Sequence, residues 1–137
     1  YNPTTWSPKK EESSKGEFIQ VKFDNPFLIR QVIIVENYNP GSIERVSIFS
    51  TGGTEYEIYK NSASSTGTET RLLNIILPKL TNYKVRQVRV EMNTKAVKGF
   101  NCIDAIGISE SDYSTVKLNK NHLRNTLQFY IKEKGNE

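Results

Sequence analysis

The sequence holds few of the side chains on which catalysis and metal binding depend. Its 137 residues include one cysteine and one histidine. A single cysteine, Cys102, excludes an internal disulfide, and its place in a strand-like apolar run predicts a buried, inert thiol. The single histidine, His122, lies in the C-terminal tail, so no Cys-His or Ser-His-Asp site is expected on the body. No His/Cys spacing suits zinc, so we expect neither a metal site nor an enzyme.

Other sequence motifs of ligand chemistry are missing as well. The chain contains no EF-hand pattern and no glycine-rich phosphate loop. Gly52 and Gly53 are followed by no Lys-Ser/Thr pair, so they predict a hairpin turn. Glu36 and Glu91 both stand near predicted strand ends, and a paired-carboxylate site would require them to meet. Solvated or salt-bridged carboxylates are the interpretation we favour.

Long apolar runs are also absent. No stretch approaches the roughly 18 apolar residues of a membrane span, so none is expected. The chain opens on Tyr1 rather than on methionine, which we interpret as a cut within a larger multidomain protein.

The excess of positive charge is concentrated in the tail rather than on the body. Residues 1–116 carry 14 Lys and Arg against 13 Asp and Glu, whereas residues 117–137 carry 5 against 2. A nucleic-acid-binding domain is expected to present a basic face on its folded body. The nearly neutral body therefore predicts no nucleic-acid partner.

Short β runs, bounded by Gly, Pro, Asn and Ser, dominate what is present. Apolar and polar residues alternate in most of them, as in strands with one buried face. In residues 55–60, for example, Tyr56 and Ile58 share one face while Glu57 and Tyr59 share the other. This spacing predicts an all-β, antiparallel sandwich. The predicted strands are residues 17–23, 28–36, 44–50, 55–60, 71–77, 85–92 and 102–108.

The domain is expected to end near Ser109. Residues 1–109 form the sandwich in this interpretation, and residues 110–137 form a linker or tail that leads toward another domain. For residues 126–132 we favour a strand slightly over a helix. The helical alternative places Leu123, Leu127 and Tyr130 on one stripe.

Several segments together resemble the discoidin family of galactose-binding-like β-sandwiches. They are Trp6, the alternating run 17–23, the Pro-x-x-Ile-x-x-Val-x-Ile pattern of residues 26–34, the Val-Arg-rich run 85–90 and the Ile-rich run 103–108. The corner at residues 36–43 resembles a sub-branch that occurs as an accessory module in larger proteins, including bacterial envelope proteins. The resemblance covers roughly residues 6–108.

The resemblance implies a jelly-roll-like sandwich of about eight strands that binds sugars, lipid headgroups or protein surfaces through loops at one end. It implies an extracytoplasmic location: the bacterial periplasm, outer membrane or cell surface. The family's Asp-Gly loop ahead of the tryptophan is missing from this chain. A structural calcium ion would therefore lack its usual loop, and no cofactor is expected.

Strand direction predicts which loops share one end of the sandwich. Strands 17–23 and 28–36 are joined by a tight turn and should run antiparallel, which brings the segment before residue 17 beside the corner at residues 37–42. Strand 55–60 returns to the same end. The candidate ligand-binding residues gathered there are Trp6, Lys10, Tyr38, Asn39 and Asn61. Aromatic faces with amide donors suit sugars, and such mixed loops also suit protein partners.

Three residues are predicted to be structural. Pro40 and Gly41 fit positions i+1 and i+2 of a type II turn, in which glycine supplies the positive φ. Asp104 places a charge within an apolar run, so it should be hydrogen-bonded or ion-paired. Trp6 and Tyr38 have a structural alternative too, because both rings can pack over the core. We expect the corner chiefly to turn the chain.

The sequence therefore predicts a non-catalytic binding module. Docking of a protein partner or a neighbouring domain is the leading hypothesis. The alternative is a lectin-like module that recognises cell-surface or cell-wall glycan through the loop end.

Overall fold

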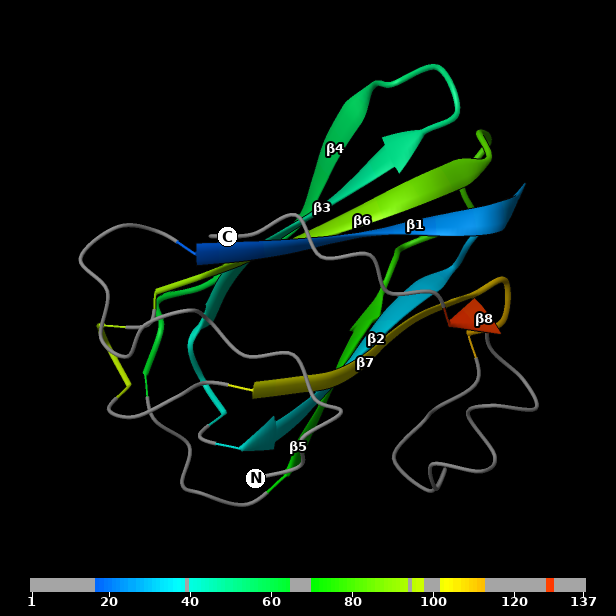
Figure 1. The fold of residues 1–137 in the computed structure, drawn as a ribbon. Coiled ribbons are helices and arrows are strands. Elements are labelled where there is room, and N and C mark those ends of the chain that lie inside the picture. The colour runs from blue at the N-terminus through cyan, green and yellow to red at the C-terminus, as the bar shows by residue number, and fades with distance from the viewer. Residues whose placement is uncertain are drawn as a thin grey trace.

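In the computed structural model, two antiparallel sheets face each other (Figure 1). The structure describes residues 17–38, 40–64, 70–93, 95–97, 102–112 and 128–129. These residues form strands, turns and loops, and no helix. The strands are β1 (Glu17–Phe27), β2 (Gln31–Tyr38), β3 (Ile43–Ser50), β4 (Glu55–Lys60), β5 (Arg71–Ile76), β6 (Val85–Met92), β7 (Cys102–Ser109) and β8 (Gln128–Phe129).

The strand order is β1-β6-β3-β4 in one sheet and β5-β2-β7-β8 in the other. Every neighbouring pair is antiparallel. The all-β, two-sheet architecture predicted from alternation is therefore confirmed. β8 is a two-residue strand from the tail that pairs with β7 through Gly107 and Ile108. Of the strand preferred for residues 126–132, the structure describes Gln128 and Phe129, and both are in strand conformation.

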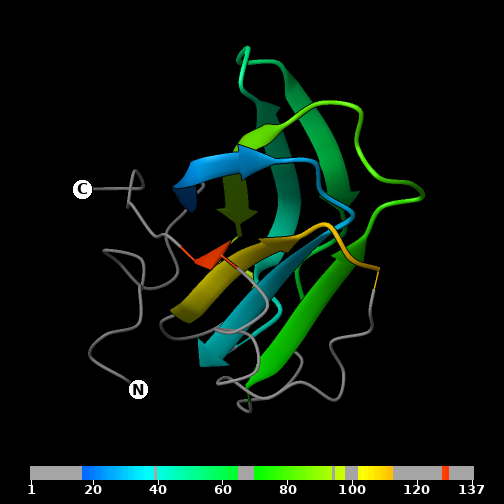
Figure 2. The same ribbon diagram turned by 90° about the vertical axis from the view of Figure 1, so that its right-hand side faces the viewer.

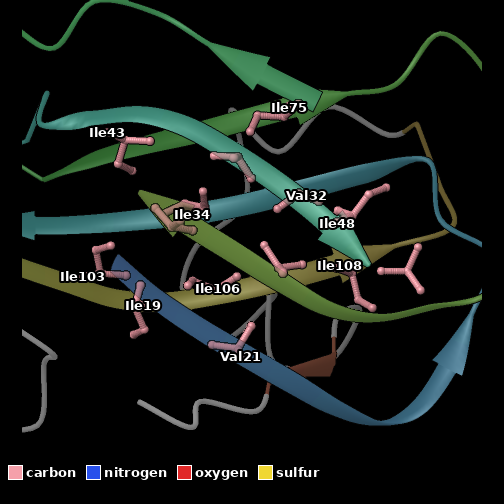
Figure 3. Close-up of a cluster of buried hydrophobic side chains, with 14 of the residues drawn as sticks. Ile19, Val21, Val32, Ile34, Ile43, Ile48, Ile75, Ile103, Ile106 and Ile108 are labelled. Atoms are coloured by element: carbon pink, nitrogen blue, oxygen red, sulfur yellow. The ribbon is translucent and has the colours of Figure 1, made fainter. Parts of the chain in front are cut away.

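The core lies between the two sheets (Figure 3). Ile19 and Val21 project from β1, Ile43 and Ile48 from β3, and Ile75 from β5. β-branched side chains favour strands because they pack well on a pleated surface. Alternation thus places one apolar set between the sheets, and its burial is the main source of stability.

β2 is buried on both of its faces. Ile34 belongs to the core cluster, whereas Gln31 and Ile33 lie on the opposite face and are also buried. β2 is central in its sheet, between β5 and β7. Residues 32–35 form a continuous apolar run, which is typical of a central strand buried on both faces.

The turn predicted at residues 24–26 lies instead inside β1. The register with β6 shifts between Lys22 and Phe27, and Phe27 pairs with Val85. β1 is an edge strand, and an irregular edge tolerates Pro26 because its missing N–H leaves no ladder bond unmade. Because β1 continues to Phe27, the chain crosses to β2 in the other sheet at residues 28–30.

The strand registers define two ends of the sandwich. Glu17 and Ile43 both pair with Met92, and Tyr38 pairs with Cys102. We call this the corner end; β1 begins there, at the left of Figure 1. The opposite end, here the distal end, contains the Gly52–Gly53 hairpin turn, residues 28–30 and the loop formed by residues 77–84.

Candidate functional site

The corner after β2 is held by a buried carboxylate. Glu36 is buried, and its Oε1 accepts a hydrogen bond of 3.0 Å from the Gly41 amide. Its other oxygen accepts from Nε of Arg71, at the start of the neighbouring strand β5. The Glu36 carboxylate therefore accepts hydrogen bonds from the turn backbone and from an arginine. A buried charge requires such partners.

Backbone contacts fix the rest of the corner. Gly41 has a φ of 109°, in the region that favours glycine, as the turn prediction requires. Pro40 and Gly41 are buried. Ser64 donates its amide to the Gly41 carbonyl at 2.9 Å, and Asn93 donates to the Ser42 carbonyl at 2.8 Å. The expectation that this corner chiefly turns the chain agrees with these contacts.

The structure brings together only part of the predicted ligand-binding set. Asn61 is exposed, and its loop reaches the corner through the contact from Ser64 to Gly41. Trp6, Lys10 and Asn39 lie outside the described residues, as does the side chain of Tyr38. The loop at residues 61–70 is predicted to join the corner end, and its described part, residues 61–64, contacts Gly41 there.

A polar depression of about 550 Å³ opens beside Asn61. Asn61 also donates its side-chain amide to the Tyr59 hydroxyl, at 3.3 Å. The residues that line the depression come from β3, β4, β6 and the loop after β4, and are Glu44, Arg45, Lys60, Asn61, Ser62 and Glu91. Within this described lining there is no aromatic ring on which a sugar could stack.

Arg45 is the centre of the charges around the depression. Its guanidinium lies 2.9 Å from Glu55, 2.7 Å from Glu57 and 2.5 Å from Glu91. The hydrogen bonds that Arg45 donates, above all those to Glu57 and Glu91, raise its pKa. The pKa of Glu55 is lowered by the Ser47 hydroxyl and then by Arg45. The three carboxylates are therefore engaged with a protein cation.

A second arginine lies among aromatic rings on the same sheet. The Arg89 guanidinium carbon is 4.8 Å from the centre of the Phe18 ring and 5.7 Å from that of Phe49. Its Nε donates to Gln20 at 3.1 Å. The residues come from β1, β3 and β6, so these contacts connect three strands across the outer surface of the sheet.

No catalytic carboxylate pair forms from the two candidates. Glu36 binds Arg71 and Glu91 binds Arg45, and the two glutamates stand on strands of different sheets. This agrees with their interpretation as salt-bridged groups. No group of three His, Cys, Asp or Glu side chains in the described residues could hold a metal ion.

Two further predicted residues lie on β7. Cys102 is a buried free thiol, as predicted, and burial raises its pKa, which disfavours the reactive thiolate. Asp104 is half-buried and stands at a register shift: Glu36 pairs with Ile103 while Val35 pairs with Ala105. Asp104 also makes a polar or electrostatic contact. Its predicted structural role is compatible with that place.

Sequence reasoning missed a set of exposed apolar side chains at the distal end. The large hydrophobic side chains that are exposed in the described residues are Leu28, Tyr56, Ile76 and Leu80, at 36, 37, 46 and 42%. All four lie at the distal end, although they come from both sheets and from two loops. Leu28 and Leu80 each follow a proline by two residues. An apolar residue in such a turn-like segment could have indicated an exposed apolar side chain.

The loop formed by residues 77–84 contacts two other segments of the distal end. The Tyr83 ring stacks on Tyr56, with centroids 4.2 Å apart and planes within 9°. Thr81 donates its amide to the Ile29 carbonyl at 2.9 Å and accepts from the Ile29 amide at 3.0 Å. Leu77 donates to the Arg30 carbonyl at 2.7 Å. The loop is thus fastened to β4 and to residues 28–30.

Comparison with protein-family models, with curated proteins and with solved structures finds no match to this chain. Among the described residues there is no helix long and apolar enough to cross a membrane.

Proposed function

We propose that this chain is a non-catalytic interaction module of a larger extracytoplasmic protein, and that its distal end docks a protein partner or a neighbouring domain. The observation that carries the proposal is the collection of Leu28, Tyr56, Ile76 and Leu80 at one end of the sandwich. Exposed apolar side chains that gather in this way are typical of interaction surfaces, whereas scattered ones are not.

The composition of this surface suggests the chemistry of the partner. Tyrosine and branched aliphatic side chains are suited to the buried centre of an interface. Lys79 and Lys84 are exposed in the same loop as Leu80. A partner with an apolar centre and carboxylates around it would match both features.

The surface is also ordered before a partner arrives. The stack of Tyr56 on Tyr83 and the hydrogen bonds between Thr81 and Ile29 hold the loop in place. Binding to such a surface requires little additional ordering, which favours affinity.

The order of the strands supports a finer assignment of the fold. Successive strands change sheet at most connections, from β1 to β2, β2 to β3, β4 to β5, β5 to β6 and β6 to β7. Crossings of this kind are typical of jelly rolls. They support the galactose-binding-like, discoidin-like sandwich that the sequence resembles.

Glycan binding at the corner end is the second candidate. The observation in its favour is the depression beside Asn61, whose lining offers amide, hydroxyl, ammonium and carboxylate groups. Sugars require such paired polar partners, but they also stack on aromatic faces. Because the described lining holds no ring, docking is the better supported function.

The experiment compares wild type with Leu80→Lys and Asn61→Ala, all immobilised on one support. Cell extract from the source organism and a glycan array with peptidoglycan fragments are applied to each. Thermal melts establish that both variants fold. We expect wild type and Asn61→Ala to retain the same protein. Leu80→Lys should weaken the binding of that protein at least about tenfold.

A glycan signal lost in Asn61→Ala and kept in Leu80→Lys would favour the second candidate instead. Retention of the same proteins by all three chains would contradict docking through the distal end.

A further inference from the structure

The sheet edges of this protein differ in how well they are protected against pairing with another chain. An edge strand presents unpaired peptide groups, and proteins usually guard it with charge, proline or a bulge. β1 has Pro26 and an irregular register. β4 has Glu55, Glu57 and Lys60, with a register shift opposite Val46 and Ser47. On β7, the short strand β8 occupies part of the edge.

β5 has almost none of these protections. Its sequence is RLLNII, in which Arg71 is the only charge, and no proline occurs before Pro78. Its register with β2 is regular over all six residue pairs. In the described part of the chain it pairs with β2 alone, and it lies at the margin of its sheet (green in Figure 2).

The direction of the free peptide groups follows from one hydrogen bond. The Leu77 amide donates to the Arg30 carbonyl in the same register that pairs β5 with β2. Peptide groups alternate in direction along a strand. Those of Leu73 and Ile75 therefore point toward β2, and those of Leu72, Asn74 and Ile76 point toward the open edge.

The side chain at the middle of this edge has an unmet hydrogen bond. Oδ1 of Asn74 is buried and accepts no hydrogen bond. A buried acceptor without a donor is costly, typically by about 1–3 kcal/mol. A rotation of the side chain that brings this oxygen to the edge, where a donor of another chain can reach it, would remove this cost.

We propose that β5 is a dimerisation edge, which pairs antiparallel with β5 of a second copy about a two-fold axis at Asn74. This register places Asn74 opposite Asn74 of the second copy and Leu72 opposite Ile76, so all the outward peptide groups are paired. It also places Leu73 opposite Ile75, which extends the core face across the axis. The amide of each Asn74 then lies beside the Oδ1 of the other.

Self-pairing is favoured over a foreign strand because the sequence is complementary to itself in this one register. Apolar residues meet apolar residues on both faces, and the amide meets itself. Opposite residues in an antiparallel pair are about 4.5–5.5 Å apart, so a charge placed at position 74 faces its own copy.

The test uses this symmetry. Sedimentation equilibrium is measured for wild type, Asn74→Lys, Asn74→Asp and an equimolar mixture of the two variants. We expect wild type to approach twice the chain mass of 15.7 kDa as concentration rises. Each variant alone should remain a monomer because like charges oppose one another. The mixture should recover the dimer.

A second pair of variants tests the edge without adding charge. Asn74→Pro removes an outward N–H and leaves the ladder with β2 intact, so it should abolish the dimer. Lys60→Pro is the matched control on β4. Asn61 donates to Glu44 in the β3–β4 register, so the peptide group of Lys60 points away from β3. This variant should still dimerise.

Wild type that remains a monomer up to about 1 mM, a weak limit for specific association, would overturn the proposal. So would a dimer that persists in both Asn74→Lys and Asn74→Asp. If Asn74→Pro fails to fold, the charge variants still decide. None of these variants changes Leu28, Tyr56, Ile76 or Leu80, so a failure here leaves docking through the distal end untouched. Of these four side chains, Ile76 also belongs to the β5 edge.

Discussion

Glu36 and Gly41 are joined by a hydrogen bond between the glutamate carboxylate and the glycine amide, 3.0 Å long and buried. The same carboxylate receives Arg71 from β5. The strand end, the turn and the neighbouring strand thus depend on a single side chain. The corner is therefore built as a structural joint.

Replacement of Glu36 should destabilise the protein strongly. Glu36→Ala leaves the Gly41 amide and the Arg71 guanidinium without their acceptor, so we expect a loss of about 3 kcal/mol in the free energy of unfolding. Urea unfolding measures it. Glu57→Ala, which removes an exposed carboxylate, serves as the control and should cost under about 1 kcal/mol. Equal losses in the two variants would contradict this role of Glu36.

Adjacent glycines in the β3–β4 turn should respond differently to alanine. Gly53 has a φ of 89°, and its amide donates to the Ser50 carbonyl. Gly53→Ala should cost about 1–2 kcal/mol because a side chain rarely adopts this conformation. A Cβ at Gly52 meets only the Ser50 hydroxyl at 3.7 Å, an ordinary contact. Gly52→Ala should be nearly neutral in thermal melts, and a reversed order would refute the assignment.

The carboxylates around Arg45 should make stability depend on pH. The pKa of Glu55 is lowered in the folded state from its ordinary value of 4.5. Its contribution is therefore present above pH 4.5 and is lost as the pH falls through the folded-state pKa. Unfolding free energy measured from pH 7 to pH 3 should decline less steeply in Glu55→Gln than in wild type. Parallel curves would show that Glu55 contributes nothing.

Glu17 is a carboxylate whose removal should help. It is 1% exposed, and neither of its carboxylate oxygens has a hydrogen-bond partner. Glu17→Leu should raise the free energy of unfolding by about 1–3 kcal/mol, since a buried polar group without a partner is destabilising. Chemical denaturation measures this change. A loss of stability on substitution would mean that the carboxylate has a role beyond packing.

Local patterns in the sequence predicted where the strands lie in the chain better than they predicted which strands are neighbours in space. β4 and β6 occupy the residues expected, because alternation and the turn residues beside them are local signals. Pro26 led to a wrong prediction of a turn, because an irregular edge strand accommodates the proline. In β4 the register shift turns Tyr59 toward the core side opposite Val46, although simple alternation placed it with Glu57.

The candidate surfaces depended on contacts that no local pattern contains. The pairing of Glu36 with Arg71 spans 35 residues, and the sheet partners of each strand are set by such distant contacts. Strand direction was sufficient to bring the residue 61–64 loop to the corner. It did not indicate that Leu28, Tyr56, Ile76 and Leu80 would all lie exposed at the other end, because they come from four separate segments.

Docking through the distal end is tested most directly by photo-crosslinking in the intact parent protein within its own cells. A photoreactive amino acid replaces Leu80 in one strain and Asn61 in another, and the adducts are identified by mass spectrometry. The account predicts a discrete protein adduct, or a crosslink to a neighbouring domain, from position 80 and none from position 61. Adducts from position 61 alone, or the same adducts from both, would contradict it.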